Sequence, residues 1–467
     1  MLTLPQPSRD LLWRQLIDRI ERYIQTIDAE PVSQPTTAAE IRQQLAPFDF
    51  GNETSPDEAL DFVADLLMST QVHTSHRSYY GLFNPNPTTM GIAADALVAA
   101  FNPQLAAWSH SPAACEIEQH VLRWLGGLFG YDPETVAGSF TSGGAEANHS
   151  ALLAALMSQF PEFGEHGVAA IEGRPTLYVT GESHHSFVKG ARACGLGTAA
   201  VRRVAVDDDF IMDPAALAAL IQQDRDQGDR PFLVVATMGT TNAGLIDPID
   251  DLLAVTASER LWLHADAAWG GAAALAPELR PHLGSIERAD SITVDAHKWL
   301  SVTMGAGIFL TRHPEIPRKT FSTSTDYMPV LGDGVIEPYE TSMQWSRRFI
   351  GLKLFLSLVV AGREGYAQAI SHQTEIGNVL RQQLTDHGWR VVNRTPLPTV
   401  CWTDGEGTDN SLERLVAICD RVVTSGEAWI STTKLGGQLP VLRATITNYR
   451  TEETDIRRLM ETLERAR

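Results

Sequence analysis

Short runs of apolar and β-branched residues alternate with helical stretches through the middle of the chain, from about Ser109 to Pro317. Alternation of this kind is typical of a mostly parallel sheet with helices on both faces. The sequence therefore predicts an α/β fold. The expected strands are Leu177–Thr180, Ala200–Val206, Phe232–Thr237, Leu261–Ala265, Ser291–Val294 and Ile308–Thr311.

A lysine follows directly on a histidine just past one expected strand, in Ser291-Ile-Thr-Val-Asp-Ala-His-Lys-Trp-Leu300. Open α/β sheets bind their ligands at this end of the strands. An amine held there, partly out of water and beside a second nitrogen base, loses proton affinity and can attack a carbonyl to form a Schiff base. An isolated His-Lys pair is more often a surface feature. The catalytic interpretation of Lys298 therefore depends on the segments that accompany it.

An acid ends the preceding expected strand, in Leu261-Trp-Leu-His-Ala-Asp-Ala-Ala-Trp-Gly270. Pyridoxal phosphate needs such a carboxylate, because its ring draws electrons well only while the pyridine nitrogen stays protonated. The small neighbours Ala265, Ala267 and Ala268 leave room for a flat ring. Asp266 is therefore the expected partner of that nitrogen.

A glycine-rich turn precedes an alanine- and leucine-rich helix at Thr141-Ser-Gly-Gly-Ala-Glu-Ala-Asn148. Glycines let backbone N–H groups close on an anion, and the start of a helix adds the positive end of its dipole. Alone, such a turn is more often a plain connection. Its value here comes from the order along the chain, which is anion cradle, then acid, then lysine.

Several segments look like signatures of the pyridoxal-phosphate-dependent group II amino acid decarboxylases, in the family's order: Glu182-Ser-His-His-Ser-Phe-Val-Lys-Gly190, His264-Ala-Asp-Ala-Ala268 and His297-Lys-Trp299. The chain resembles that family, which includes aromatic-L-amino-acid decarboxylase, from about Tyr79 to Arg450. The resemblance implies the fold of the type I pyridoxal-phosphate-dependent transferases. It also implies decarboxylation of an L-amino acid to its amine and carbon dioxide.

The same resemblance gives roles to residues of this sequence. Lys298 would carry the cofactor, Asp266 would pair with its pyridinium nitrogen, and His184, in preference to His185, would stack on its ring and contact the substrate carboxylate. The residues implied at the phosphate are Gly144, Ala145, Thr241, Asp295 and His297.

Two positions depart from the family pattern. Ala145 stands where relatives often have a hydroxyl, and the missing hydrogen bond to a charged group is worth roughly 1.5–3 kcal/mol if nothing replaces it. Asp295 stands where aromatic decarboxylases usually have asparagine. A carboxylate beside a phosphate is repelled unless it bonds to a hydroxyl, a backbone N–H or His297.

The turn-rich stretch Ser322–Gly334 has no apolar periodicity and is expected to form a mobile loop. Tyr327 lies in it where decarboxylases of the family have the tyrosine that protonates the carbanion carbon, whereas related aldehyde synthases have phenylalanine. This position favours plain decarboxylation over oxidative deamination.

The substrate is less constrained by the sequence. Gln104 and Ala106 stand where aromatic decarboxylases tend to be apolar or bulky, which indicates a roomier or more polar pocket. We nevertheless expect an aromatic L-amino acid. The aromatic residues that could face its side chain, or could equally be core residues, are Tyr79, Tyr80, Phe83 and Trp108.

The chain of 467 residues carries a net charge of −20 without any Lys/Arg-rich run, which argues against nucleic acid and anionic membranes as partners. No stretch approaches the ~20 apolar residues that span a bilayer, and no basic-then-apolar leader opens the chain, so we expect a cytoplasmic enzyme. The four cysteines lack metal-ligand spacing, so neither disulfides nor a metal site is expected.

An N-terminal arm carries apolar faces that it cannot bury alone. The stretch Ser8–Asp28 has the pattern of an amphipathic helix, and a second helical stretch covers Pro56–Met68. In the family the equivalent arm packs on a second subunit, which predicts a homodimer. We expect a helical arm over residues 1–108, a cofactor-binding α/β domain over 109–345 and a small α+β domain over 346–467, whose last helix has Thr451 as its N-cap.

An amino acid decarboxylase is the function that the sequence favours. An aldehyde synthase or an aminotransferase on the same scaffold comes second. A cofactor-binding protein without catalysis comes third, because Lys298, Asp266, His184 and Tyr327 are all present.

Overall fold

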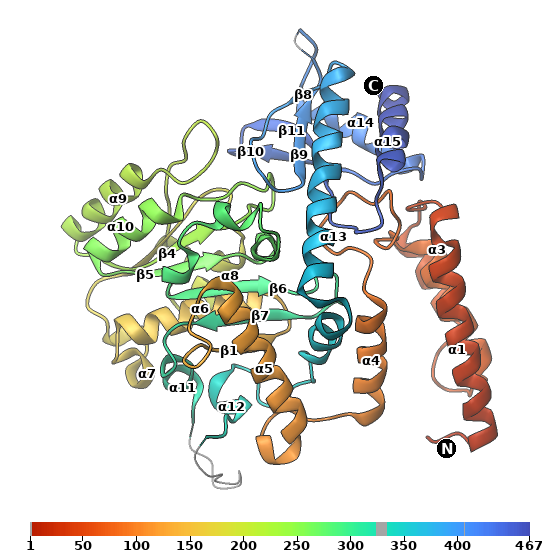
Figure 1. The fold of residues 1–467 in the computed structure, drawn as a ribbon, viewed down its shortest axis with the longest axis horizontal. Helices are drawn as coiled ribbons and strands as arrows, with labels where there is room; N and C mark the ends of the chain where they lie inside the picture. The colour runs from red at the N-terminus through yellow and green to blue at the C-terminus, as the bar shows by residue number, and fades with distance from the viewer. Residues whose placement is uncertain (1, 324–333, 406) are drawn as a thin grey trace.

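The computed structural model describes residues 2–323, 334–405 and 407–467, so Tyr327 lies outside the described residues. Figure 1 shows a large sheet among helices, a smaller sheet toward the C-terminus, and N-terminal helices standing to one side. The strands of the large sheet are β1 (Ala137–Thr141), β2 (Pro175–Val179), β3 (Val201–Arg203), β4 (Arg230–Thr237), β5 (Trp262–Asp266), β6 (Ser291–Asp295) and β7 (Gly307–Thr311).

The strands of the smaller sheet are β8 (Arg390–Val391), β9 (Thr399–Thr403), β10 (Ser431–Leu435) and β11 (Leu439–Thr445). The helices are α1 (Gln6–Thr26), α2 (Ala38–Leu45), α3 (Pro56–Thr70), α4 (Thr89–Phe101), α5 (Pro112–Phe129), α6 (Gly144–Gln159), α7 (Phe163–His166), α8 (Ser186–Ala193), α9 (Pro214–Asp226), α10 (Ile249–Glu259), α11 (Ile316–Phe321), α12 (Pro338–Thr341), α13 (Leu352–Asp386), α14 (Leu412–Thr424) and α15 (Glu453–Ala466).

The large sheet has the order β1-β7-β6-β5-β4-β2-β3. All neighbouring strands are parallel except at β7, which runs antiparallel to both β1 and β6. The predicted α/β fold with a mostly parallel sheet is confirmed. Strand β1 was not predicted, because its sequence Ala-Gly-Ser-Phe-Thr lacks a β-branched apolar run.

Alternation along β5 places its last two polar side chains on one face of the sheet. Leu263 and Ala265 join the core on one face of the sheet, whereas His264 and Asp266 point to the other face and contact Asn148 of α6. Successive side chains of a strand point to opposite faces, so an interval of two places both polar residues on the same side. A polar region therefore lies between the sheet and α6.

The smaller sheet has the order β10-β11-β9-β8 and packs with α14, α15 and the C-terminal half of α13 around a second core. Helix α13 runs from Leu352 to Asp386, with a break at Gly362, where φ is 67°. The predicted N-cap Thr451 is wrong. Its hydroxyl donates to the carbonyl of Arg77 instead, and Glu452 caps α15 through a capping box with Asp455.

The N-terminal helices α1 and α3 lie side by side, away from the large sheet (Figure 1). Helix α1 has no buried residue, and its apolar side chains Trp13 and Ile17 are 54% and 56% exposed. The predicted amphipathic helix is present, but its apolar stripe is only partly covered by the described part of the chain. None of the described helices is long and apolar enough to cross a membrane.

Candidate active site

The site lies where the carboxyl ends of β5 and β6 meet the start of β7. Asp266 ends β5, and Asp295 ends the neighbouring parallel strand β6. Gly307 of the reversed strand β7 pairs with Asp295 on one side and with Thr141 of β1 on the other. This register brings the acid, the segment leading to Lys298 and the turn before α6 to one edge of the sheet.

The amine of Lys298 lies 2.9 Å from the Oδ2 atom of Asp295. Its side chain is 22% exposed, and Nζ lies 5.8 Å from the ring centroid of Phe83. The lysine is therefore half withdrawn from water, paired with an acid and open on one side to an aromatic wall.

The carboxylate of Asp266 is only 4% exposed. Its Oδ2 atom accepts a hydrogen bond of 2.8 Å from Nδ2 of Asn148, and Oδ1 accepts one of 3.2 Å from the backbone N–H of Ala268. Each oxygen keeps room for a further donor, so this carboxylate can hold a cation at the base of the site.

His184 follows β2 and has an exposed ring. Its Nδ1 atom lies 2.9 Å from the hydroxyl of Ser186. Loss of water on the protein side of the ring lowers the pKa of His184, the charge of Asp266 opposes this shift, and Lys298 adds to it. A neutral, flat ring is the result. The neighbouring His185 instead stands at the N-cap of α8.

The glycine-rich turn leads directly into α6, whose first residue is Gly144. A Cβ atom on Gly144 would lie 2.5 Å from Oδ2 of Asp295, so the backbone of the turn can approach this edge only as glycine. The first N–H groups of a helix have no partner within it. Those of Gly144 and the exposed Ala145 can therefore bind an anion.

Two of the other residues predicted at the phosphate, Asp295 and His297, lie beside this helix start. The backbone N–H of Ala306 donates to Nδ1 of His297 at 3.2 Å, and burial lowers the pKa of this histidine. Asp295 is 2% exposed, and its Oδ1 atom has no hydrogen-bond partner among the described residues. Thr241 lies half-buried in the turn after β4.

These residues fit pyridoxal phosphate. The half-exposed amine can reach an aldehyde, the buried carboxylate has free lone pairs for a pyridinium N–H, and the helix start offers donors to a phosphate. Asp295 fits less well, because its carboxylate, with one unpartnered oxygen, faces the same helix start.

Sequence analysis missed one cation in this region, Arg443 of β11. It is 3% exposed, and its guanidinium carbon lies 5.1 Å from the ring centroid of Phe83. Its Nη1 and Nε atoms donate to the carbonyls of Gly81 and Asn242, whereas Nη2 has no partner and no carboxylate pairs with it in the described ranges. An arginine inside an apolar strand was the signal that could have found it.

The predicted aromatic wall is divided by the structure. Phe83 stacks on Trp269 at 4.6 Å between ring centroids and faces Lys298. Tyr80 is fully buried in the core of the smaller sheet, so its ring has no surface to offer a substrate. Trp108 packs half-buried beside Cys115, and its indole N–H donates to Glu116.

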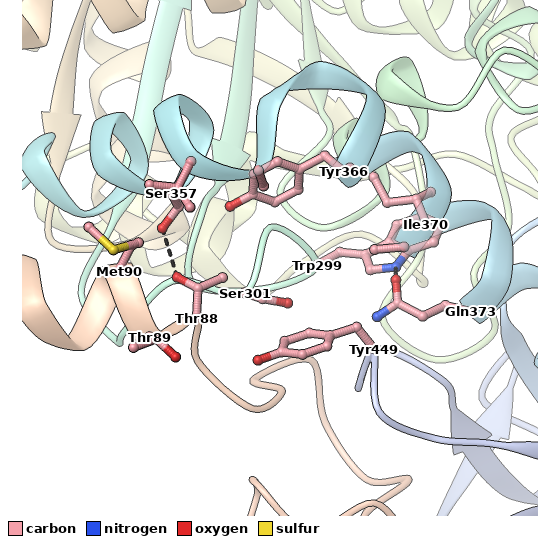
Figure 2. A pocket seen from close by; sticks show the side chains of 14 residues that line it. Thr88, Thr89, Met90, Trp299, Ser301, Ser357, Tyr366, Ile370, Gln373 and Tyr449 are labelled. Atoms are coloured by element: carbon pink, nitrogen blue, oxygen red, sulfur yellow. Dashed lines mark hydrogen bonds between the residues drawn. The ribbon is translucent and has the colours of Figure 1, made fainter.

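A separate cavity of about 310 Å³ lies beside Trp299, the residue after Lys298. Figure 2 shows it between the hydrogen-bonded hydroxyls of Thr88 and Ser357 and the pair formed by Trp299 and Gln373. Its lining contains neither Lys298 nor any charged residue, so it lacks the groups that the reaction needs.

Comparison with known proteins agrees with this geometry. The pyridoxal-dependent decarboxylase conserved domain matches residues 41–403. An aromatic-L-amino-acid decarboxylase of Bacillus atrophaeus is 30% identical over 459 residues, with 96% of this chain and 92% of the relative covered. A tyrosine decarboxylase of Oryza sativa subsp. japonica is 29% identical, covering 96% and 88%. The structure of Oryza sativa TDC with PLP and tryptamine superposes with a TM-score of 0.93 at 25% identity, covering 100% and 99%.

The fold and the donor set thus define a type I pyridoxal-phosphate-dependent enzyme. The chain belongs to the pyridoxal-dependent decarboxylase family and is an amino acid decarboxylase that uses pyridoxal phosphate. The predicted family, cofactor and class of enzyme are confirmed.

Replacing Asp295 by asparagine should tighten binding of pyridoxal phosphate to the apoenzyme by about tenfold, or roughly 1.4 kcal/mol. The change removes a negative charge beside the helix start and also removes the ion pair that holds Lys298 in the apoenzyme. Absorbance titration of the apoenzyme with cofactor measures this. Weaker binding in Asp295→Asn would show that the acid bonds to the cofactor, either as a protonated donor or through a shared proton.

Proposed function

We propose that this enzyme decarboxylates an aromatic L-amino acid to its amine and carbon dioxide. The convergence of Lys298, Asp266 and His184 at one edge of the large sheet carries the proposal. The aromatic substrate is supported by the names of the relatives and by the ring of Phe83 beside the lysine amine.

Each residue has a distinct part. When bound, pyridoxal phosphate supplies an aldehyde for the substrate amine and a pyridinium ring that accepts the electrons left by carbon dioxide. Asp266 would hold the proton on the ring nitrogen, and His184 would cover the ring. The backbone of Gly144 and Ala145 binds the phosphate at the start of α6, where Thr241, Asp295 and His297 complete the surroundings.

Arg443 offers a donor to the carboxylate of the substrate. Its unpartnered Nη2 atom is buried near Phe83, and a buried cation without an anion is costly until an anion pairs with it. His184 offers a second donor. A pair of donors on the leaving carboxylate would orient it relative to the ring plane.

We also propose a homodimer, supported by the exposed apolar side chains of α1, among them Trp13 and Ile17. A cytoplasmic location is supported by the cysteines Cys115, Cys194, Cys401 and Cys419, all of which are free thiols. The division into residues 1–108, 109–345 and 346–467 is likewise a proposal, supported by the separate cores around the two sheets.

Borohydride reduction of the holoenzyme should fix the cofactor on Lys298, as located by mass spectrometry of peptides. Lys353 is an internal comparison, because it is 3% exposed and burial lowers the pKa of its amine. Its Nζ atom is engaged by the carbonyl of Met304 at 2.6 Å. We therefore expect no adduct on Lys353, although its amine is desolvated. An adduct on Lys353, or on an exposed lysine such as Lys319, would end the assignment of Lys298 and with it the proposed site.

Tyr327 distinguishes decarboxylation from aldehyde synthesis. Its hydroxyl can return a proton to the carbon from which carbon dioxide has left, and phenylalanine cannot. In Tyr327→Phe, dioxygen and water should instead convert the substrate to aldehyde, ammonia, hydrogen peroxide and carbon dioxide. Oxygen uptake and product analysis measure the change. Amine formation at the parent rate without oxygen uptake would remove Tyr327 as the proton donor.

The dimer can be tested on the exposed face of α1. Ile17→Asp places a charge within the apolar stripe and should weaken dimerisation at least about tenfold, or roughly 1.4 kcal/mol, because a charge is costly to bury. Arg14→Asp, on the same helix at an exposed polar position, is the matched control. Analytical ultracentrifugation gives both dissociation constants. A parent protein that is monomeric and fully active would refute the dimer.

A further inference from the structure

A chain of hydrogen bonds joins His184 to Asp266 behind the site, through residues to which the motifs gave no role. Asn148 of α6 is 2% exposed. Its Nδ2 atom donates to Oδ2 of Asp266 at 2.8 Å and to the hydroxyl of Ser186 at 2.9 Å. That hydroxyl lies 2.9 Å from Nδ1 of His184.

The direction of this chain is fixed by the carboxylate of Asp266, which accepts from Nδ2 of Asn148 and so turns the amide oxygen toward His264. At the far end, the indole N–H of Trp262 donates to the hydroxyl of Ser291 at 2.9 Å. The hydroxyl hydrogen is left free to point to Nδ1 of His264, 2.8 Å away. Burial lowers the pKa of His264 to about 4, so this ring is neutral and carries its hydrogen on Nε2, facing Oδ1 of Asn148 at 3.2 Å.

The amide of Asn148 consequently has one favourable orientation. Its oxygen accepts from His264, and its two hydrogens serve Asp266 and Ser186. The flipped amide would place its oxygen against the carboxylate and leave buried groups without partners, which is costly in a desolvated network. The carboxylate of Asp266 requires this orientation of the Asn148 amide, and the indole donor of Trp262 at the other end is compatible with it.

Ser186 passes this direction on to His184. Its hydroxyl oxygen accepts from Asn148, so the hydroxyl hydrogen points to Nδ1 of the histidine. The backbone N–H of Ser186 also points to Nδ1, at 3.3 Å. With Nδ1 an acceptor, the hydrogen of the neutral ring lies on Nε2. The charged or titratable groups around this ring are Asp266, Lys298, Asp295 and His185.

We propose that Asn148 and Ser186 are positioning residues that hold His184 as the neutral tautomer with its hydrogen on Nε2. We call the hydrogen bonds from Asp266 through Asn148 and Ser186 to His184 the relay. Through the relay, the amide of Asn148 holds both Asp266 and the ring of His184. The tautomer follows from the hydrogen bonds alone. Its use, donation from Nε2 to the carboxylate of the substrate, rests on the proposed function.

The test is nitrogen NMR of the holoenzyme labelled with ¹⁵N-histidine, with the signals of His184 assigned through His184→Gln. At neutral pH we expect a protonated Nε2 and an unprotonated Nδ1. Ser186→Ala removes the hydroxyl and should increase the share of the Nδ1–H form. It should also lower kcat about ten- to a hundredfold, the range found when a partner that orients a metal-binding histidine is removed, with the cofactor content unchanged. Ser186→Thr keeps a hydroxyl and should restore both the tautomer and kcat.

Ser150→Ala is the matched control, because Ser150 lies on α6 two residues from Asn148 and its hydroxyl donates to the carbonyl of Glu146, outside the relay. It should keep the tautomer and kcat of the parent. An Nδ1–H or doubly protonated His184 in the parent, or an unchanged tautomer in Ser186→Ala, would overturn the proposal. Failure of the parent to release carbon dioxide would refute the proposed function while leaving the tautomer measurement intact.

Discussion

The buried charge of Asp266 is the constraint on which the rest of the site depends. A carboxylate that is almost fully withdrawn from water must be solvated by protein dipoles, and here an amide and a backbone N–H do so. The amide of Asn148 is itself fixed by His264, which is fixed by Ser291. A polar layer between β5 and α6 is therefore needed within an otherwise apolar core, and every member of it has a partner that sets its orientation.

The site also depends on the meeting of two sheets. The large sheet supplies the lysine, the acid and the start of α6, whereas β11 of the smaller sheet supplies Arg443. Phe83 lies within reach of both cations, Lys298 and Arg443, and so marks the place where the two sheets face each other. In the resting chain the lysine is paired with Asp295, whereas the arginine has no anionic partner in the described ranges. This arginine is suited to bind a substrate that carries a carboxylate.

Local chemistry explains which sequence predictions succeeded. Strands such as β4 and β6 are buried on both faces and read as apolar runs, so both were found close to their bounds. Strand β1 was missed because it is short and rich in small and polar residues, and only pairing with β7 makes it a strand. Thr451 was a reasonable cap by residue type, yet its hydroxyl is taken by the carbonyl of Arg77, which is remote in sequence. Tyr80 was expected to line the pocket together with Phe83, but it packs in the other core.

The sequence by itself determined the alternation of strands and helices, the family and the cofactor, and it singled out a lysine, an acid and a histidine as candidates, because these are properties of residue type and spacing. Tertiary structure alone decided how those residues are held. The ion pair of Lys298 with Asp295, the approach of Arg443 to Phe83 and the relay through Asn148 all join segments far apart in the chain. Hydrogen-bond direction and burial arise only when such segments meet. No local pattern could therefore have specified the tautomer of His184, or that Arg443 lacks a carboxylate partner within the described ranges.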